Sequence, residues 1–409
     1  MKDDAQQQAP RVRACLYYPW LYLTSGGERT IVELVTRSRH QWTIVTNEYQ
    51  PDAAPPELRA LDVRVLQRVP VKRSLAAVAV AAWRILTQRL DLDGFDVLLV
   101  VCEGLGDLVV LRRPPVPALC LCLTPLRVVF DPVYRATYLA TRGPIHRAAV
   151  RAGSAVFRIA DRHAWRHYAR IFAISREVER RIAMGKLAPA ERVTRLHPGV
   201  DVSTYVPTTT WSRTFFVPGR IMWTKNIELA IRAFLRFRAL VPEGDTWKLR
   251  IAGMVDRKSV PYLSRLQELA GGDPAIEFCV HPEDEGMRRF YAESYATLFT
   301  ALNEDWGLVM IEALACGKPV IAVNRGGPLE IVRHDRDGLL VPPDEASFAD
   351  AMCRLVTERG LRDRLAAEGP AGAERFGWEP FVNGIDDALS AAVADATAGV
   401  PLGVQVTHA

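Results

Sequence analysis

The sequence predicts an α/β fold made of two doubly wound, Rossmann-like domains that face each other across a cleft. Short apolar runs rich in β-branched residues indicate parallel strands that are buried on both faces. Longer segments with helical spacing lie between these runs, as they do in βαβ units. The alternation stops at a stretch containing Pro and Gly, residues 197–211, and then starts again. Two sheets joined by a short linker follow from this pattern.

The first half begins with an apolar strand and alternates from there. Its predicted strands are Val12–Tyr18, Trp42–Thr46, Val63–Val69, Val97–Cys102, Leu119–Thr124 and Ile171–Ser175. Its predicted helices are Glu28–Arg37, Leu75–Arg89, Ile145–Tyr168 and Arg176–Lys186. We expect this half to be a domain covering residues 1–205.

The second half repeats the same alternation after the linker. Its predicted strands are Phe215–Gly219, Lys248–Ala252, Ile276–Val280, Thr297–Thr300 and Val320–Val323. Its predicted helices are Ile227–Leu240, Tyr262–Ala270, Glu285–Glu293, Leu308–Cys316 and Phe348–Val356, followed by Phe381–Ala396. We expect a ligand-binding domain at residues 206–380. Residues 381–409 then form a helix that packs back on the first domain, and a tail.

Composition excludes several classes of protein. Of 409 residues, 49% are hydrophobic and 24% are charged, so the chain is globular rather than disordered. The longest apolar stretch, residues 75–86, contains Arg84 and is well short of the roughly 20 residues that a membrane span needs. The polar start, residues 1–10, resembles no secretory signal. We expect a cytoplasmic protein, with peripheral contact to the inner face of the membrane left open.

Charge and cysteine usage argue against nucleic-acid and metal binding. The net charge of +5 is too small to indicate a nucleic-acid partner. The 7 cysteines form no Cys-x-x-Cys pair, so we interpret them as small buried hydrophobic residues in a reducing compartment. We expect no metal. Asp91 and Asp93 resemble the Asp-x-Asp of metal-dependent sugar transferases, but their setting before Gly94 favours a polar turn.

The strongest chemical signal is the segment from Asn303 to Glu312. Glu304 lies in a loop after a buried strand, and Glu312 lies inside the next helix. At the start of that helix the backbone amides of Gly307, Leu308 and Val309 can bind an anion. Two carboxylates beside an anion site suit sugar and ribose hydroxyls. A surface helix with an acidic first turn is the alternative interpretation.

Two further loops follow the first strand of each half. Arg220 and Lys225 leave the first strand of the second half, where two cations suit a diphosphate. Solvated loop residues are the alternative. Gly26 and Gly27 open a helix in the first half and allow backbone amides to approach an anion, or they form an ordinary turn. Neither a Gly-x-Gly-x-x-Gly nor a Walker sequence is present.

These segments together resemble the retaining glycosyltransferases of family 4, which have the two-domain GT-B fold. The resemblance rests on the Glu-x7-Glu pattern and its surroundings, residues 304–330, EDWGLVMIEALACGKPVIAVNRGGPLE. Gly219–Arg220 with Lys225 is similar to the family's phosphate-binding loop. Residues 26–29 are similar to its N-terminal glycine loop, and residues 197–201 to its interdomain joint.

The resemblance implies roles for these residues. Glu312 holds the ribose hydroxyls of the nucleotide and Glu304 contacts the donor sugar. Arg220 and Lys225 neutralise the diphosphate leaving group, with help from the amides of residues 307–309, and Gly27 approaches the phosphates from the other domain. The family is commonly metal-independent and attacks from the front face, so that the donor phosphate accepts the acceptor's proton.

One departure from the family lies in residues 122–127, CLTPLR. Leu123 stands where relatives often carry a histidine that faces the donor sugar or acceptor. Thr124 and Arg127 keep the pattern and are candidates for the cleft, with a surface arginine as the alternative for Arg127. The absence of the histidine puts acceptor handling, and ordinary activity, in question.

The region 135–181 is rich in positive charge. It holds 11 Arg against Asp161, Glu177 and Glu179. A solvated helix face is one interpretation. Docking on an anionic lipid surface or an acidic acceptor is the other. The apolar residues 75–83 allow a membrane-facing stripe, although a core helix is favoured.

We therefore predict a retaining, metal-independent hexosyltransferase that uses a nucleotide-diphosphate sugar. The stretch 323–330 and the Thr-Pro-x-Arg segment look most like mannosyltransferases acting on lipid-linked or polymeric glycans, which favours GDP-mannose. A UDP-sugar enzyme of natural-product or small-molecule glycosylation is the alternative. A nucleotide-sugar-binding protein without turnover, and an epimerase or phosphorylase of the same fold, are the alternatives from other classes.

Overall fold

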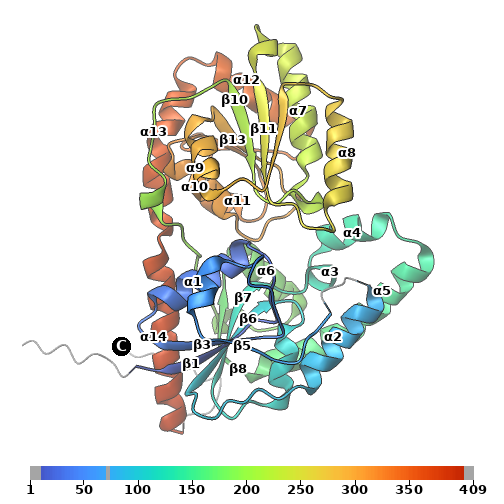
Figure 1. Cartoon of the computed structure of the whole chain (residues 1–409), viewed down its shortest axis with the longest axis vertical. Helices are drawn as coiled ribbons and strands as arrows, with labels where there is room; N and C mark the ends of the chain where they lie inside the picture. Colours follow the sequence, from blue (N-terminus) through green and yellow to red (C-terminus); the bar gives the residue numbers. More distant parts are fainter. Residues whose placement is uncertain (1–10, 71–73, 400–409) are drawn as a thin grey trace, which may run out of the picture. The chain divides into compact units, whose positions relative to one another are not determined.

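The computed structural model describes residues 11–70 and 74–399 and divides them into two compact units (Figure 1). The first unit runs to His197 and includes the chain from Trp378 onward, and the second is Pro198–Gly377. These boundaries lie eight and three residues before the expected 205/206 and 380/381. The linker residues belong to the second unit because Val200 N–H donates to Phe376 O at 2.8 Å and Trp306 Nε1 donates to Pro198 O at 2.9 Å.

The first unit contains a parallel seven-stranded sheet. In spatial order its strands are β5 (Val63–Val65), β3 (Gln41–Thr46), β1 (Arg13–Tyr17), β6 (Val97–Glu103), β7 (Ala118–Thr124), β8 (Tyr168–Ala173) and β9 (Val193–Arg195). Its main helices are α1 (Gly26–Arg37), α2 (Leu75–Thr87), α4 (Pro132–Ala140), α5 (Pro144–Ala164), α6 (Arg176–Gly185) and α14 (Trp378–Thr397). Strand β7 is buried along its whole length, as expected for an apolar central strand.

The last helix belongs to the first unit because polar contacts tie it there. The carboxylate of Asp386 accepts hydrogen bonds from Ser38 Oγ at 2.6 Å and from the Arg39 N–H at 2.9 Å. Arg170 pairs with Asp395 at 2.9 Å. Helix α14 therefore returns the chain to the first unit after it has crossed the second.

The second unit contains a parallel six-stranded sheet. In spatial order its strands are β12 (Ile276–Val280), β11 (Lys248–Gly253), β10 (Thr214–Pro218), β13 (Ala296–Phe299), β14 (Val320–Val323) and β15 (Gly338–Val341). Its main helices are α7 (Ile227–Leu240), α8 (Val260–Ala270), α9 (Asp284–Glu293), α10 (Leu308–Ala315), α12 (Glu345–Thr357) and α13 (Leu361–Ala373). Its buried core includes stacked Phe215 and Trp247, whose ring centroids lie 5.2 Å apart.

Strand order reverses direction at one point in each sheet. In the first unit β1 lies between β3 and β6, and in the second β10 lies between β11 and β13. Ligands of open α/β sheets bind outside the carboxyl ends of the strands at such points. The loops that follow β1, β6, β10 and β13 are therefore the places to look for a site.

The prediction of two doubly wound parallel sheets is confirmed, with local errors. The expected helix 145–168 ends at Ala164, and a single 3₁₀ turn, Trp165–His167, precedes β8. We missed α13, whose helical pattern contains Pro370, and β15, which follows a turn. Asp91–Gly94 is a turn, as predicted. None of the helices in the described ranges is both long and apolar enough to cross a membrane.

Candidate functional site

In the second unit a small hollow lies at the carboxyl ends of β10 and β13. It is lined by Val217, Pro218, Lys225, Leu298, Phe299, Thr300 and Ala301. The lining residues come from the two strands that flank the reversal point. Its one charged lining side chain is Lys225, which places an ammonium group at the edge of the sheet where a ligand is expected.

The loop after β10 approaches its neighbours closely because it contains glycine. Gly219 has a φ of +113°, which disfavours a side chain. A Cβ on Gly253 would lie 2.0 Å from Gly219 O, so β11 also needs glycine there. On its other side, a Cβ on Gly219 would be 3.9 Å from Val309 Cγ1. The loop that carries partly exposed Arg220 therefore lies against the start of α10.

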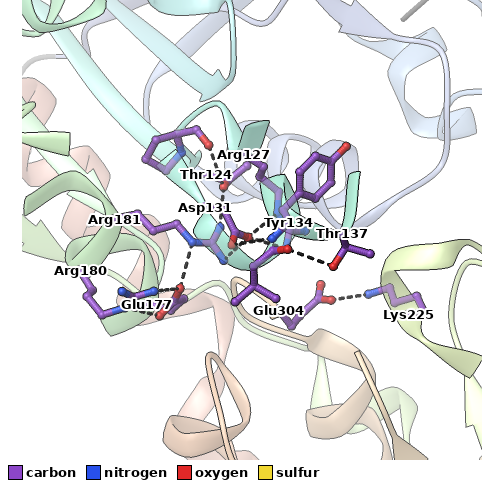
Figure 2. Close-up of polar contacts among 12 residues, drawn as sticks. Thr124, Arg127, Asp131, Tyr134, Thr137, Glu177, Arg180, Arg181, Lys225 and Glu304 are labelled. Carbon is purple, nitrogen blue, oxygen red and sulfur yellow. Dashed lines mark hydrogen bonds and ion pairs between the residues drawn. The ribbon is translucent and has the colours of Figure 1, made fainter. Parts of the chain in front are cut away.

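Lys225 and Glu304 form an ion pair across the reversal point. Lys225 Nζ lies 2.8 Å from Glu304 Oε2, with both side chains about four-fifths buried (Figure 2). The Lys225 ammonium also lies 5.6 Å from the centre of the Phe299 ring. The Lys225 backbone is held by Thr300, whose hydroxyl donates to Lys225 O at 2.9 Å. The structure thus brings together two residues that the sequence separates by 79 positions.

Glycines also fix the loop that carries Glu304. A Cβ on Gly326 would lie 2.5 Å from Glu304 O, and a Cβ on Gly327 would lie 2.1 Å from Trp306 O. The Gly327 N–H donates to Glu304 O at 2.9 Å. Gly307, with φ of +120°, then turns the chain into α10. The amides of residues 307–309 consequently lie at a helix N-terminus, where intrahelical acceptors are lacking.

Glu312 is almost fully buried, although its predicted contact with a ribose requires only a carboxylate at the surface of the site. It is only 6% exposed, and its Oε2 accepts a hydrogen bond of 2.7 Å from the Tyr291 hydroxyl on α9. Burial and the Glu312 charge raise the pKa of Tyr291 well above its ordinary value, so the hydroxyl stays a donor. We did not expect Tyr291; its place on the helix before β13 gave no signal.

In the first unit the glycine loop lies beside Leu123. A Cβ on Gly27 would lie 3.1 Å from Leu123 Cδ1, 3.6 Å from Glu103 Oε2 and 3.7 Å from the Tyr18 hydroxyl. Tyr18 donates to Glu103 at 2.6 Å. These residues follow or end β1, β6 and β7 at the reversal point of that sheet. Glu103 and Tyr18 were missed, although their position at strand ends could have indicated them.

Thr124 and Arg127 belong to a charged network inside the first unit (Figure 2). Arg181, fully buried, reaches Asp131 at 3.1 Å, Glu177 at 2.9 Å and Thr124 Oγ1 at 3.1 Å. Arg127 pairs with Asp131 at 3.0 Å. Burial raises the pKa of Asp131, but the charges of Arg181 and Arg127 and the Tyr134 N–H outweigh it and lower that pKa overall. Thr124 and Arg127 are thus already engaged in holding the segment after β7.

The described cysteines and acids form no metal site. Among residues 11–70 and 74–399, no group of three or more His, Cys, Asp or Glu side chains could hold an ion. Cys102, Cys120 and Cys122 are buried thiols, and burial raises their pKa well above the ordinary value. Cys102 donates to Asp107, which also accepts from Tyr168 at 2.6 Å.

Comparisons with protein families and with curated relatives find similarity mainly in the second unit. Residues 209–371 match the family model described as glycosyl transferases group 1. D-inositol 3-phosphate glycosyltransferase from Nocardioides sp. is 32% identical over 214 residues, which cover 47% of this chain and 47% of the relative. Alpha-1,3/1,6-mannosyltransferase ALG2 from Rhizomucor pusillus is 32% identical over 172 residues, 36% of this chain and 38% of the relative. The chain spans about half the length of the curated relatives it matches.

Solved structures match nearly the whole chain. A sucrose-phosphate synthase from Thermosynechococcus elongatus has a TM-score of 0.74 at 18% identity and covers 94% of this chain and 100% of its own. HepE from Anabaena, solved with UDP and glucose, has a TM-score of 0.71 at 16% identity and covers 93% and 100%. At these identities the likeness shows the fold, which is the predicted GT-B fold.

Proposed function

We propose that the chain, whose residues 209–371 match the family of group 1 glycosyl transferases, transfers a hexose from a nucleotide-diphosphate sugar to an acceptor hydroxyl, with retention of configuration. The observation that carries the proposal is the Lys225–Glu304 ion pair at the carboxyl ends of β10 and β13. A cation for phosphate and a carboxylate for hydroxyls are thereby held together at one edge of the sheet.

The leaving group needs positive charge as its bond to the sugar breaks. Lys225 lies in the hollow, Arg220 is on the same loop, and that loop touches the start of α10. The two cations and the helix N-terminus supply fixed charge and dipoles that stabilise the developing diphosphate. No metal is required by this arrangement, because Arg220 and Lys225 supply the charge that a divalent cation supplies elsewhere.

The two glutamates take different parts of the donor. Glu304, in the loop, exchanges its contact with Lys225 for hydroxyls of the donor sugar when the diphosphate takes the ammonium. Glu312 keeps the hydrogen bond that its Oε2 accepts from Tyr291. The remaining lone pairs of the carboxylate accept hydrogen bonds from the ribose hydroxyls. The sugar C1–O bond to the phosphate breaks, the acceptor oxygen bonds to C1 from the same face, and its proton passes to the departing phosphate oxygen.

We propose GDP-mannose as the donor, with a UDP-sugar as the alternative. The chain's stretch 323–330 and its similarity to relatives named as mannosyltransferases support GDP-mannose. The fold neighbour HepE, solved with UDP-glucose at 15% identity, keeps the UDP-sugar alternative in view. The acceptor is a glycan, a lipid-linked glycan or a small molecule.

A second candidate function rests on Leu123. Its side chain packs where Gly27 approaches and supplies neither a proton donor nor an acceptor. The chain would then bind a nucleotide sugar without turning it over at an ordinary rate. In Leu123→His, restored transfer with unchanged donor affinity supports this function; equal transfer rates for the variant and the parent protein contradict it.

Calorimetry with GDP, UDP, ADP and dTDP, with and without a chelator, tests the proposed function. We expect selective binding of one diphosphate that survives chelation, which also identifies the donor class. Binding that disappears with the chelator contradicts the role of Arg220 and Lys225, and no binding of any diphosphate contradicts the proposal itself.

A further inference from the structure

Helix α5 has a second apolar face that points to solvent. One face packs on the unit through Val150, Ser154, Asp161 and Ala164. On the other side Ile145, Val156 and Ile159 are 86%, 70% and 72% exposed. These large aliphatic side chains do not help to cover the sheet, because they lie on the outer face of a surface helix.

These side chains form one line. Ile145, Ala149, Ala152, Val156 and Ile159 follow one another at spacings of four, three, four and three residues, so they lie along a single face of the helix. At 1.5 Å per residue the line is about 21 Å long. We call these five residues the α5 apolar stripe.

Four arginines lie on a third face of the helix. Arg147, Arg151, Arg158 and Arg162 are spaced by four, seven and four residues, so they share one face, between the face packed on the unit and the stripe and about 130° around the helix from the centre of the stripe. Arg147 donates to Leu139 O and Ala140 O, and Arg162 donates to Gly185 O. Carbonyls orient these side chains without neutralising them. We call these four residues the α5 arginine row.

Acidic residues are missing from this part of the chain. Residues 132–160 contain neither Asp nor Glu, and Asp161 is buried. No ion pair forms at the four arginines of the row within the described ranges. The basic region 135–181 therefore has two parts. Arg180 and Arg181 form ion pairs with carboxylates of the first unit, whereas the α5 arginine row keeps its charge at the surface.

Helix α2 extends the apolar surface. Trp83 is 66% exposed, and Leu75 and Val80 are also exposed. Both α2 and α5 pack on the same 3₁₀ segment, Gly106–Arg112, and they run side by side in Figure 1. Exposed tryptophan, aliphatic and basic side chains on neighbouring helices are typical of a protein face at a membrane–water interface.

We propose that the α5 apolar stripe and the α5 arginine row dock the chain on an anionic phospholipid surface. The stripe enters the boundary between head groups and acyl chains, and the row binds lipid phosphates beside it. A second copy of the chain would set two uncompensated arginine rows against each other, and a nucleic acid would leave the aliphatic stripe in water. An anionic phospholipid surface offers acyl chains to the stripe and negative charge to the arginine row, so it suits both. The proposal does not depend on the donor site.

Vesicle flotation tests this surface. The intact chain is mixed with vesicles of phosphatidylcholine alone and with 30% phosphatidylglycerol, at low and high salt. Two double variants probe the face: Val156→Ser with Ile159→Ser, and Arg151→Glu with Arg158→Glu. Matched controls in the second unit are Leu240→Ser and Arg359→Glu, which change exposed residues of the same kinds. Circular dichroism and diphosphate binding report whether each variant is folded and whether the donor site is intact.

We expect binding only to the anionic vesicles, weakened by salt. Each basic side chain near an anionic surface contributes roughly fivefold, so the double arginine variant should bind about 25-fold more weakly or worse. The serine variant should lose about tenfold or more, and both controls should bind like the parent chain. Equal vesicle binding by all variants overturns the proposal. So does a dimer that the serine variant dissociates, or binding to heparin without binding to vesicles.

Discussion

Lys225 Nζ lies 2.8 Å from Glu304 Oε2, and this pair joins the loops after β10 and β13. An ammonium and a carboxylate that hold each other can each be displaced by one part of a sugar nucleotide. The diphosphate competes for the ammonium, and the hydroxyls of the sugar compete for the carboxylate. The site is thus charged on both sides of the bond that the proposed reaction breaks.

Glu304→Gln should change the affinity for a nucleoside diphosphate and the affinity for the sugar nucleotide in different ways. The variant removes a negative charge beside the phosphate site, so a nucleoside diphosphate should bind as well as before or up to about tenfold more tightly. The nucleotide sugar should lose that gain because the amide is a poorer acceptor of sugar hydroxyls. Calorimetry with UDP or GDP against the matching sugar nucleotide measures both. An equal change for the two ligands argues against contact between Glu304 and the sugar.

Glu312→Ala should abolish donor binding to a greater extent than it disturbs folding. The substitution leaves the buried Tyr291 hydroxyl without its acceptor, which costs about 1–3 kcal/mol of unfolding free energy. Tyr291→Phe is the matched control, since it breaks the same hydrogen bond and leaves the carboxylate in place. Chemical unfolding and donor titration of both variants give the comparison. If the folded alanine variant keeps normal donor affinity, Glu312 does not hold the ribose.

Asp131→Asn should destabilise the first unit. It removes one of the two carboxylates that accompany the fully buried Arg181, with an expected loss of about 3 kcal/mol. The folded pKa of Asp131 is lowered, so the stability it contributes is present above its unfolded pKa and is lost as pH falls through the folded pKa. The difference from the parent chain should be constant near pH 7 and shrink below about pH 4. Asp395→Asn, at a more exposed pair, should cost less than about 1 kcal/mol. Equal losses for the two variants are the contrary outcome.

Asp107→Asn should change how stability depends on pH. Burial raises the pKa of Asp107 to about 6, against the partial opposition of Cys102 and Tyr168. Because the folded pKa is raised, the stability from the neutral acid is full below the unfolded pKa and is lost as pH rises through 6. From pH 4 to 7 the parent chain should therefore lose on the order of 2–3 kcal/mol relative to the variant. Urea unfolding at several pH values measures this, and parallel curves would contradict it.

Much of the fold could be predicted because β10 and β7 are apolar along their length and the helices between strands are amphipathic. Helix α13 was missed because Pro370 is a local signal for a break, which tertiary packing overrode. Strand β15 was missed because it is only four residues long and follows directly on a turn. Motif spacing identified Glu304 and Lys225, but their pairing could not be foreseen. It depends on how two strands lie side by side in the sheet.

Contacts within the first unit were harder to foresee. Leu123 was recognised as a departure from a pattern, yet its contact with Gly27 depends on the order of β1, β6 and β7 in space. Arg181 seemed one arginine among many in a basic region. Its complete burial is accompanied by ion pairs with Asp131 and Glu177. Glu177 lies one helical turn before it, but Asp131 is distant in the sequence and is not visibly its partner.

Nucleoside diphosphate binding by Lys225→Met, measured in the presence of a chelator, tests whether Lys225 binds the diphosphate leaving group. Methionine keeps the apolar stem over Phe299 and removes the ammonium, and Arg257→Met, at an exposed position of the same unit, is the control. A charge-assisted contact is worth about 1.5–3 kcal/mol, so affinity should fall between about tenfold and 150-fold while the control binds normally. If Lys225→Met is folded and binds the diphosphate as tightly as the parent chain, the assignment of this site to the leaving group is wrong.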